Sequence, residues 1–193
     1  AAIGGKVAID LPAGKNLVGA FYQPKAVIAD VSTLATLPIR ELSAGFAEVI
    51  KHAFIRDSAM LNELRNLAKS QPIITSETTE DGRHRIADLI SRNMALKAKI
   101  ISTDERESNT RMLLNYGHTI GHAIEQASGY GQYLHGEAVA IGMVGAAMIA
   151  ERMGMIDATL TAEHKDLLVM HGLPVHISRE NGITVDDILH AIL

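Results

Sequence analysis

Three histidines that could bind a metal or transfer a proton lie in one Gly-containing stretch, residues 111–143. His118 and His122 are four residues apart, so on a helix they share one face. His135 follows a Gly-rich turn and is expected to begin a second helix, one made largely of small residues. A catalytic Zn²⁺ site keeps about three protein ligands and one open position. We therefore look for an acidic ligand elsewhere, and Glu48, within GFAEVIKHAF, is the best candidate.

Cationic and amide side chains in other Gly-rich or apolar stretches complete the candidate site. They are Lys6, Lys15, Asn16, Lys51, Lys97, Arg111 and Asn115. Such groups suit an anionic substrate that has a carboxylate or a phosphate. Each could also be an ordinary surface residue: Lys51 could pair with Glu48 in solvent, and Lys97 could snorkel from a helix edge. Glu48, however, lies among apolar neighbours, where an unpaired carboxylate is costly, and this favours a metal or a buried lysine beside it.

Helices must position most of these groups. Hydrophobic residues make up 47% of the chain, aromatic residues only 4%, and Trp is absent, a mixture that suits packed helices better than a β-sandwich. Ser43 and Thr184 are the expected N-caps of the first and last long helices. A short helix is also expected after Pro38. Apolar residues at helical spacing predict the longer helices over residues 44–56, 60–69, 82–102, 162–170 and 185–193.

One strand and one loop are expected before the helices. Residues 25–30 (KAVIAD) form a short β-branched run after Pro24, which predicts a buried strand. Residues 33–38 (TLATLP) are expected to follow as a Thr-rich loop. The end of a strand is a common place for a cofactor, although this pattern is generic.

Composition argues against several classes of protein. The net charge of −4 disfavours a general nucleic-acid surface. The longest apolar run, residues 138–150, is interrupted by two glycines and is too short to span a bilayer, and no signal peptide is found. The absence of cysteine removes disulfides and thiolate metal sites, so we expect a cytoplasmic protein that binds neither nucleic acid nor membrane. The histidines outside the site lie in surface-like contexts: His164, His171, His176 and His190.

Several longer motifs closely resemble the 3-dehydroquinate synthase family of sugar-phosphate cyclases. They span residues 3–143 in the order found in the family: IGGKVAIDLPAGKNLVGAFYQP, LPIRELSAGFAEVIKHAFI, MALKAKIISTDERE, LLNYGHTIGHAIE and LHGEAVAIGM. The resemblance implies a mainly α fold in which residues 33–193 form a multi-helical metal- and substrate-binding domain. Residues 1–32 would be the tail of an α/β NAD-binding domain, with the active site in the cleft between the two.

The resemblance also implies a role for each candidate residue. Glu48, His118 and His135 would hold Zn²⁺ or Co²⁺, in place of the His118–His122 pair that spacing alone favours. His122 would face the substrate phosphate. The substrate carboxylate would be held by Lys97 and Arg111, and its hydroxyls and phosphate by Lys6, Asn16, Lys51 and Asn115. NAD would contact Lys6, Lys15, Thr33, Leu34, Ala35 and Thr36.

In this family, 3-deoxy-D-arabino-heptulosonate 7-phosphate is converted to 3-dehydroquinate and phosphate in the shikimate pathway, which leads to aromatic amino acids. NAD oxidises one substrate hydroxyl transiently, and the metal polarises the same oxygen. Members have a whole NAD-binding domain before IGGK and are commonly homodimers. Here Ala1-Ala2 and Val7 stand where Ser-Ser and Thr are usual. We therefore expect a piece of a longer, homodimeric enzyme that is inactive alone.

Three other functions fit part of the same pattern. A related cyclase that makes 2-deoxy-scyllo-inosose or an epi-valiolone would share the metal ligands, but Lys97 with Arg111 favours a substrate that has a carboxylate. A metal-dependent polyol dehydrogenase would need no phosphate-binding lysines. A non-catalytic helical interaction domain would bind neither metal nor phosphorylated sugar acid.

Overall fold

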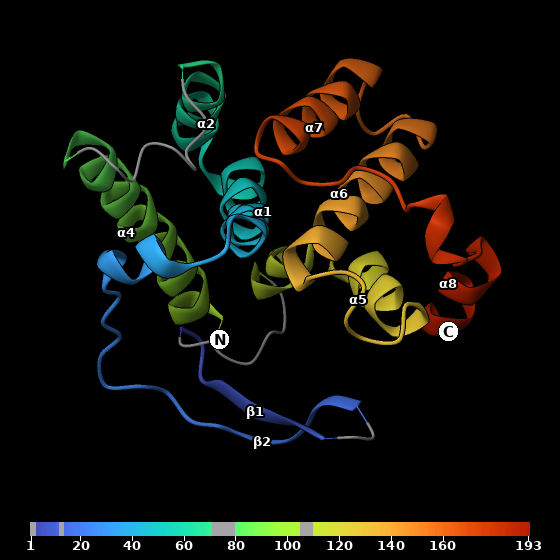
Figure 1. Cartoon of the computed structure of the whole chain (residues 1–193), viewed down its shortest axis with the longest axis horizontal. Coiled ribbons are helices and arrows are strands. Elements are labelled where there is room, and N and C mark those ends of the chain that lie inside the picture. The colour runs from blue at the N-terminus through green and yellow to red at the C-terminus, as the bar shows by residue number, and fades with distance from the viewer. Residues whose placement is uncertain (1–2, 12–13, 71–79, 105–109) are drawn as a thin grey trace.

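The computed structural model describes residues 3–11, 14–70, 80–104 and 110–193. Most of these residues form helices, and a β-hairpin extends from the N-terminal end, below the helices in Figure 1. The prediction of a mainly α fold with a short N-terminal remnant is confirmed. No helix in these ranges is both long enough and apolar enough to cross a membrane.

The hairpin pairs β1 (Lys6–Leu11) with β2 (Gly14–Phe21) in antiparallel register, with Lys6 opposite Phe21. Residues 25–30 follow as extended chain and form no strand, so the prediction of a buried strand there is wrong. A strand needs a neighbour for its backbone hydrogen bonds, and the described chain offers this segment none. Its β-branched Ile28 is instead 93% exposed.

The first helical segments begin differently from the prediction. Of residues 33–38, expected as a loop, the first four lie in the 3₁₀ helix η1 (Val31–Thr36), which Asp30 caps by accepting a hydrogen bond from the Ser32 amide. The helix α1 (Ile39–Arg56) then starts directly after Pro38. Ser43 therefore lies inside a continuous helix, where it is buried, and the prediction that it is an N-cap is wrong. Nothing between Pro38 and Ser43 interrupts a helix, and the fixed φ of proline favours a helix start.

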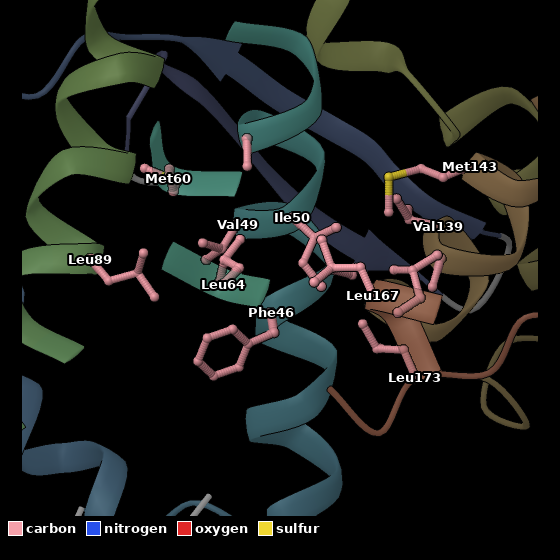
Figure 2. Packing of buried hydrophobic residues seen from close by; sticks show 14 of the residues in the cluster. Phe46, Val49, Ile50, Met60, Leu64, Leu89, Val139, Met143, Leu167 and Leu173 are labelled. Carbon is pink, nitrogen blue, oxygen red and sulfur yellow. The ribbon is translucent and has the colours of Figure 1, made fainter. Parts of the chain in front are cut away.

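The helix α1 lies at the centre of the molecule (Figure 1). Around it pack α2 (Ser58–Ser70), α4 (Glu80–Thr103), α6 (His135–Arg152) and α7 (Ala158–Met170). Figure 2 shows their shared core, in which Phe46, Val49 and Ile50 of α1 meet side chains from all four neighbours. Because α1 is held on several sides, the polar residues on the same helix are fixed in direction as well.

The remaining elements close the other end of the domain. They are the 3₁₀ helix η2 (Thr110–Asn115), α5 (His118–Ala127), the 3₁₀ turn η3 (Arg179–Asn181) and α8 (Val185–Ile192). The helix α5 packs along α6 and contacts α8. Thr184 caps α8 by accepting a hydrogen bond from the Asp187 amide, which confirms the predicted N-cap.

Two histidines expected at the surface are buried, so that prediction is wrong for them. His164 is 4% exposed and stacks on Phe54, and His171 is 5% exposed and stacks on Phe46. The charged neighbours of His164 in the sequence suggested a surface position. They lie on other faces of α7, while the histidine ring points inward. His176 and His190 are exposed, as expected.

The metal-free protein should lose stability as the pH falls below 6.5, the usual pKa of histidine. Burial lowers the pKa of both His164 and His171, so the folded chain resists protonation while the unfolded chain takes up protons. Their stabilising contribution is complete above that pH and is lost progressively below it. Urea unfolding at about pH 7.5 and about pH 5.5 measures the fall.

The variant His171→Gln should show a shallower fall in the free energy of unfolding over this pH interval. His176→Gln, which changes an exposed histidine, should keep the full fall. Equal slopes in all three proteins would contradict the assignment.

Candidate metal and substrate site

Three helices bring the metal-ligand candidates together. Glu48 comes from α1, His118 from the start of α5 and His135 from the start of α6. The Glu48 Oε1 atom lies 3.4 Å from His118 Nε2 and 3.8 Å from His135 Nε2. Within the described chain, this buried oxygen accepts no hydrogen bond. A buried carboxylate oxygen without a donor is costly, and a cation between it and the two nitrogens would relieve that cost.

His122 belongs to the same cluster. One ring nitrogen from each of His118, His122 and His135 can be chosen so that all lie within 4.8 Å of one another. The ring of His122 lies 5.3 Å from that of His118 and 5.7 Å from that of His135, measured between centroids. The geometry thus offers four candidate groups, Glu48 and three histidines, around one point. The choice of Glu48, His118 and His135 as the ligand set stays a prediction.

Lys51 holds the second oxygen of Glu48. It is 2% exposed, and its Nζ donates to Glu48 Oε2 and to the Leu114 carbonyl oxygen, both at 2.7 Å. Burial is the largest single effect and would raise the pKa of Glu48, but the charge and the hydrogen bond of Lys51, together with the charges of His118 and His52, lower that pKa to about 2. Glu48 is therefore ionised at neutral pH, with one oxygen on Lys51 and the other facing the histidines.

The surroundings of His118 favour the neutral imidazole, the form that can bind a metal. Burial, followed by the charge of Lys51, lowers the pKa of His118 to about 4, although Glu48 opposes the shift. Its Nδ1 lies 3.2 Å from the Tyr116 carbonyl oxygen, which can only accept a hydrogen bond. The proton is then on Nδ1, and Nε2 presents its lone pair to the side of Glu48. This donor set, a carboxylate with neutral imidazoles, fits Zn²⁺ or Co²⁺.

An ion pair fixes the start of α6 against α1. Arg40 of α1 donates to both carboxylate oxygens of Glu137 at 2.7 Å, and it also donates to the Gln132 carbonyl oxygen. Glu137 in turn accepts a hydrogen bond from the Leu134 amide, immediately before His135. Because the pair is bidentate, it restrains orientation as well as distance. His135 is thereby held relative to Glu48.

Three substrate-binding candidates, Lys97, Arg111 and Asn115, come from α4 and η2. Lys97 of α4 is half-buried and lies close enough to Lys51 for its charge to contribute to lowering the pKa of Lys51, after the larger effect of burial. Arg111 is 4% exposed and donates from a terminal guanidinium nitrogen to the Gly4 carbonyl oxygen at 3.2 Å. Asn115 ends η2 and is exposed. These residues come from the α4 and η2 side of Lys51, since Leu114 of η2 is its hydrogen-bond partner.

The candidate NAD contacts lie on other elements. Lys6 is exposed on β1, and Thr33, Ala35 and Thr36 are exposed on η1. Leu34 packs on the main core and holds η1 in place. The side chains of Lys15 and Asn16 lie outside the described part of the structure. Contacts of these residues with NAD or substrate stay predictions.

Sequence reasoning missed further polar residues at the site. His52 is 1% exposed, its Nδ1 lies 2.5 Å from Asn93 Oδ1, and its Nε2 lies 4.0 Å from Glu48 Oε2. Glu125 is 3% exposed and places Oε2 3.1 Å from His135 Nδ1. A signal for both existed in the spacing, because His52 is four residues after Glu48 and Glu125 is seven after His118, each on one helical face.

Comparison with known proteins gives the family. Residues 45–193 match the family model described as 3-dehydroquinate synthase C-terminal, and residues 1–44 match the one described as 3-dehydroquinate synthase N-terminal. The chain belongs to the 3-dehydroquinate synthase family. This family membership agrees with the resemblance of the motifs around Glu48, His118 and His135.

Similar curated 3-dehydroquinate synthases are known from several bacteria. One from Nitrosospira multiformis is 49% identical over 178 residues, covering 90% of this chain and 45% of the relative. One from Geobacter metallireducens is 48% identical over 176 residues, covering 91% of this chain and 47% of the relative. The chain spans about half the length of these 3-dehydroquinate synthases.

Solved structures of cyclases share the fold. A 2-deoxy-scyllo-inosose synthase complexed with carbaglucose-6-phosphate, NAD⁺ and Co²⁺ is 30% identical, with a TM-score of 0.71, and the match covers 100% of this chain and 51% of that one. A 2-epi-5-epi-valiolone synthase from Streptomyces hygroscopicus, with NAD⁺ and Zn²⁺ bound, gives a TM-score of 0.84 over 99% of this chain and 51% of that one. At 24% identity, the second likeness concerns the fold alone.

Proposed function

We propose that this chain is the metal- and substrate-binding part of a 3-dehydroquinate synthase. The protein would convert 3-deoxy-D-arabino-heptulosonate 7-phosphate to 3-dehydroquinate and phosphate, using NAD and a divalent metal. The main support is the buried Glu48 Oε1 atom, which faces the Nε2 atoms of His118 and His135 and has no hydrogen-bond donor in the described chain. The membership of the chain in the 3-dehydroquinate synthase family supports the choice of reaction.

Glu48, His118 and His135 would hold the metal, Zn²⁺ or Co²⁺. When bound, such an ion acts as a Lewis acid that stabilises negative charge on a substrate oxygen, and NAD accepts and returns a hydride. Lys51 keeps Glu48 ionised and fixes its direction through Oε2. His118 stays neutral at the pH of the cell because burial lowers its pKa to about 4.

The other residues would bind and orient the substrate. Lys97 and Arg111 would hold its carboxylate through charge-assisted hydrogen bonds, which a sugar without a carboxylate would not form. His122 would donate to the phosphate, while Lys51 and Asn115 would contact phosphate or hydroxyl groups. This assembly supplies position and electrostatics, which are the protein's usual share of catalysis with a redox cofactor.

Two features distinguish this proposal from the related cyclases. Lys97 is close enough to Lys51 to affect its pKa, and Arg111 is on the same 3₁₀ helix as Leu114, the hydrogen-bond partner of Lys51, so both could contribute to a site for a carboxylate-bearing substrate. The identity to curated 3-dehydroquinate synthases is also higher, at 49%, than the 30% to the 2-deoxy-scyllo-inosose synthase with carbaglucose-6-phosphate. The homodimer, the NAD contacts and the inactivity of this chain alone stay predictions.

Metal content of the purified 193-residue chain tests the proposal. We expect about one equivalent of Zn²⁺ in the wild type and none in His135→Ala, because His135 is a ligand. His122→Ala should keep its Zn²⁺. Metal retained in His135→Ala but lost in His122→Ala would favour the i,i+4 pair instead. A wild-type chain that binds no Zn²⁺ would contradict the metal site.

A further inference from the structure

A buried carboxylate lies behind His135, one of the exposed candidate ligands. Glu125 is on α5 and is 3% exposed, and its Oε2 atom is 3.1 Å from Nδ1 of His135 on α6. Burying an ionised carboxylate is costly unless hydrogen bonds or charges compensate it. The contact crosses between two helices, so it joins the positions of His118 and Glu125 on α5 to that of His135.

We propose that Glu125 is a positioning residue that holds His135 in the tautomer and orientation needed to bind the metal. An ionised carboxylate can only accept a hydrogen bond, so the neutral ring must keep its proton on Nδ1. The lone pair is then on Nε2, the atom that lies 3.8 Å from Glu48 Oε1. The inference rests on the proposed function, because it requires a metal between these groups.

His135 needs this support more than His118 does. The side chain of His135 is 45% exposed, against 16% for His118, so packing restricts its ring less. His118 donates to a backbone carbonyl oxygen two residues away, which is fixed by the fold. The side-chain carboxylate of Glu125 fulfils the same function for His135. Acceptors of this kind behind a metal-bound histidine fix the ring and strengthen its donation to the metal.

Charge balance supports the same role. A divalent ion held by Glu48 and two neutral histidines leaves one positive charge uncompensated, and buried Lys51 adds another. Glu125 supplies a second negative charge next to the ligand set. Since the interior screens charge weakly, this carboxylate makes metal binding more favourable.

The side chain of Glu125 can be changed without removing the local turn. The Ser128 hydroxyl and the Tyr130 amide both donate to the backbone carbonyl oxygen of Glu125. Those hydrogen bonds survive substitution of the side chain. Glu125→Gln therefore removes the charge and the obligate acceptor while keeping size and backbone structure.

Two measurements test the role of Glu125. Competition with a chromophoric chelator gives the Zn²⁺ dissociation constant, which should rise about 10- to 100-fold in Glu125→Gln, as for other residues behind metal ligands. The control is Glu163→Gln, which removes a partly buried carboxylate on α7 that pairs with Arg65 of α2, and it should leave the constant unchanged. ¹⁵N NMR of the metal-free wild type, about two pH units above the usual histidine pKa, should show His135 protonated on Nδ1.

The outcomes separate this inference from the proposed function. An unchanged dissociation constant in Glu125→Gln, an equal loss in Glu163→Gln, or His135 protonated on Nε2 in the wild type would each overturn it. A wild type that binds no Zn²⁺ contradicts the metal site. In that case, as in the case of an unfolded Glu125→Gln variant, the tautomer of wild-type His135 alone decides whether Glu125 positions the ring.

Discussion

Replacing Glu48 with glutamine should abolish stoichiometric Zn²⁺ binding and lower the free energy of unfolding of the metal-free chain by about 3 kcal/mol. The substitution keeps the size of the side chain and removes its charge. Lys51, which is 2% exposed, would then be a buried cation without its carboxylate. Losing one partner of a buried pair is costly because the desolvation of the other is no longer compensated.

Matched variants identify the buried pair as the cause. Glu41→Gln removes a carboxylate from the exposed first turn of the same helix and should change the free energy of unfolding by less than about 0.5 kcal/mol. The double variant Glu48→Gln/Lys51→Met removes both charges and should recover most of the lost stability, but no Zn²⁺ binding. Urea titration and metal analysis measure both effects. A Glu48→Gln chain as stable as Glu41→Gln would contradict this account.

Replacing Gly136 with alanine should destabilise the protein by about 1–3 kcal/mol and weaken Zn²⁺ binding together. A Cβ atom at Gly136 would overlap the carbonyl oxygen of Ala44, which is backbone and cannot rotate away. To accommodate the methyl group, α6 must move away from α1. Glu48 is on one of these helices and His135 is next to the substitution on the other, so their separation must change.

The same substitution at Gly45 is the control. Gly45 lies on α1 beside Ala44, and a Cβ atom at Gly45 would meet nothing within 4 Å. Gly45→Ala should therefore stabilise the protein by about 0.5–1 kcal/mol, the helix propensity of alanine over glycine, and leave Zn²⁺ affinity unchanged. Thermal unfolding and the Zn²⁺ dissociation constant measure both variants. Equal effects at the two glycines would rule out the contact between α1 and α6 as the cause.

Sequence patterns predicted the helices well because the helical period is a local property. The spacing of apolar residues located the long helices, and Thr184 identified the start of α8. The prediction of a strand at residues 25–30 is wrong because a strand forms only beside a neighbouring strand, and periodicity does not reveal whether one is present. The inward direction of His164 depends on which face of α7 meets Phe54, and charged neighbours concealed it.

At the site, sequence context pointed to Glu48 as the acidic ligand and spacing alone favoured His118 with His122, and family resemblance was needed to choose His135 in place of His122. The structure brings all four groups together without selecting among them. The contact between Glu125 and His135 depends on how α5 crosses α6. No pattern within either helix predicts that crossing, although the position of Glu125 seven residues after His118 placed it on the correct face.

The helices α5 and α6 begin at His118 and His135, so two helix N-termini converge on the same side of α1. Each N-terminus has the effect of about half a positive charge. With Lys51 and Lys97 nearby, they offset the negative charges of Glu48 and Glu125 in a chain whose net charge is −4. The anionic substrate proposed above would then meet less repulsion at the site than over the rest of the molecule, and added salt would weaken that difference.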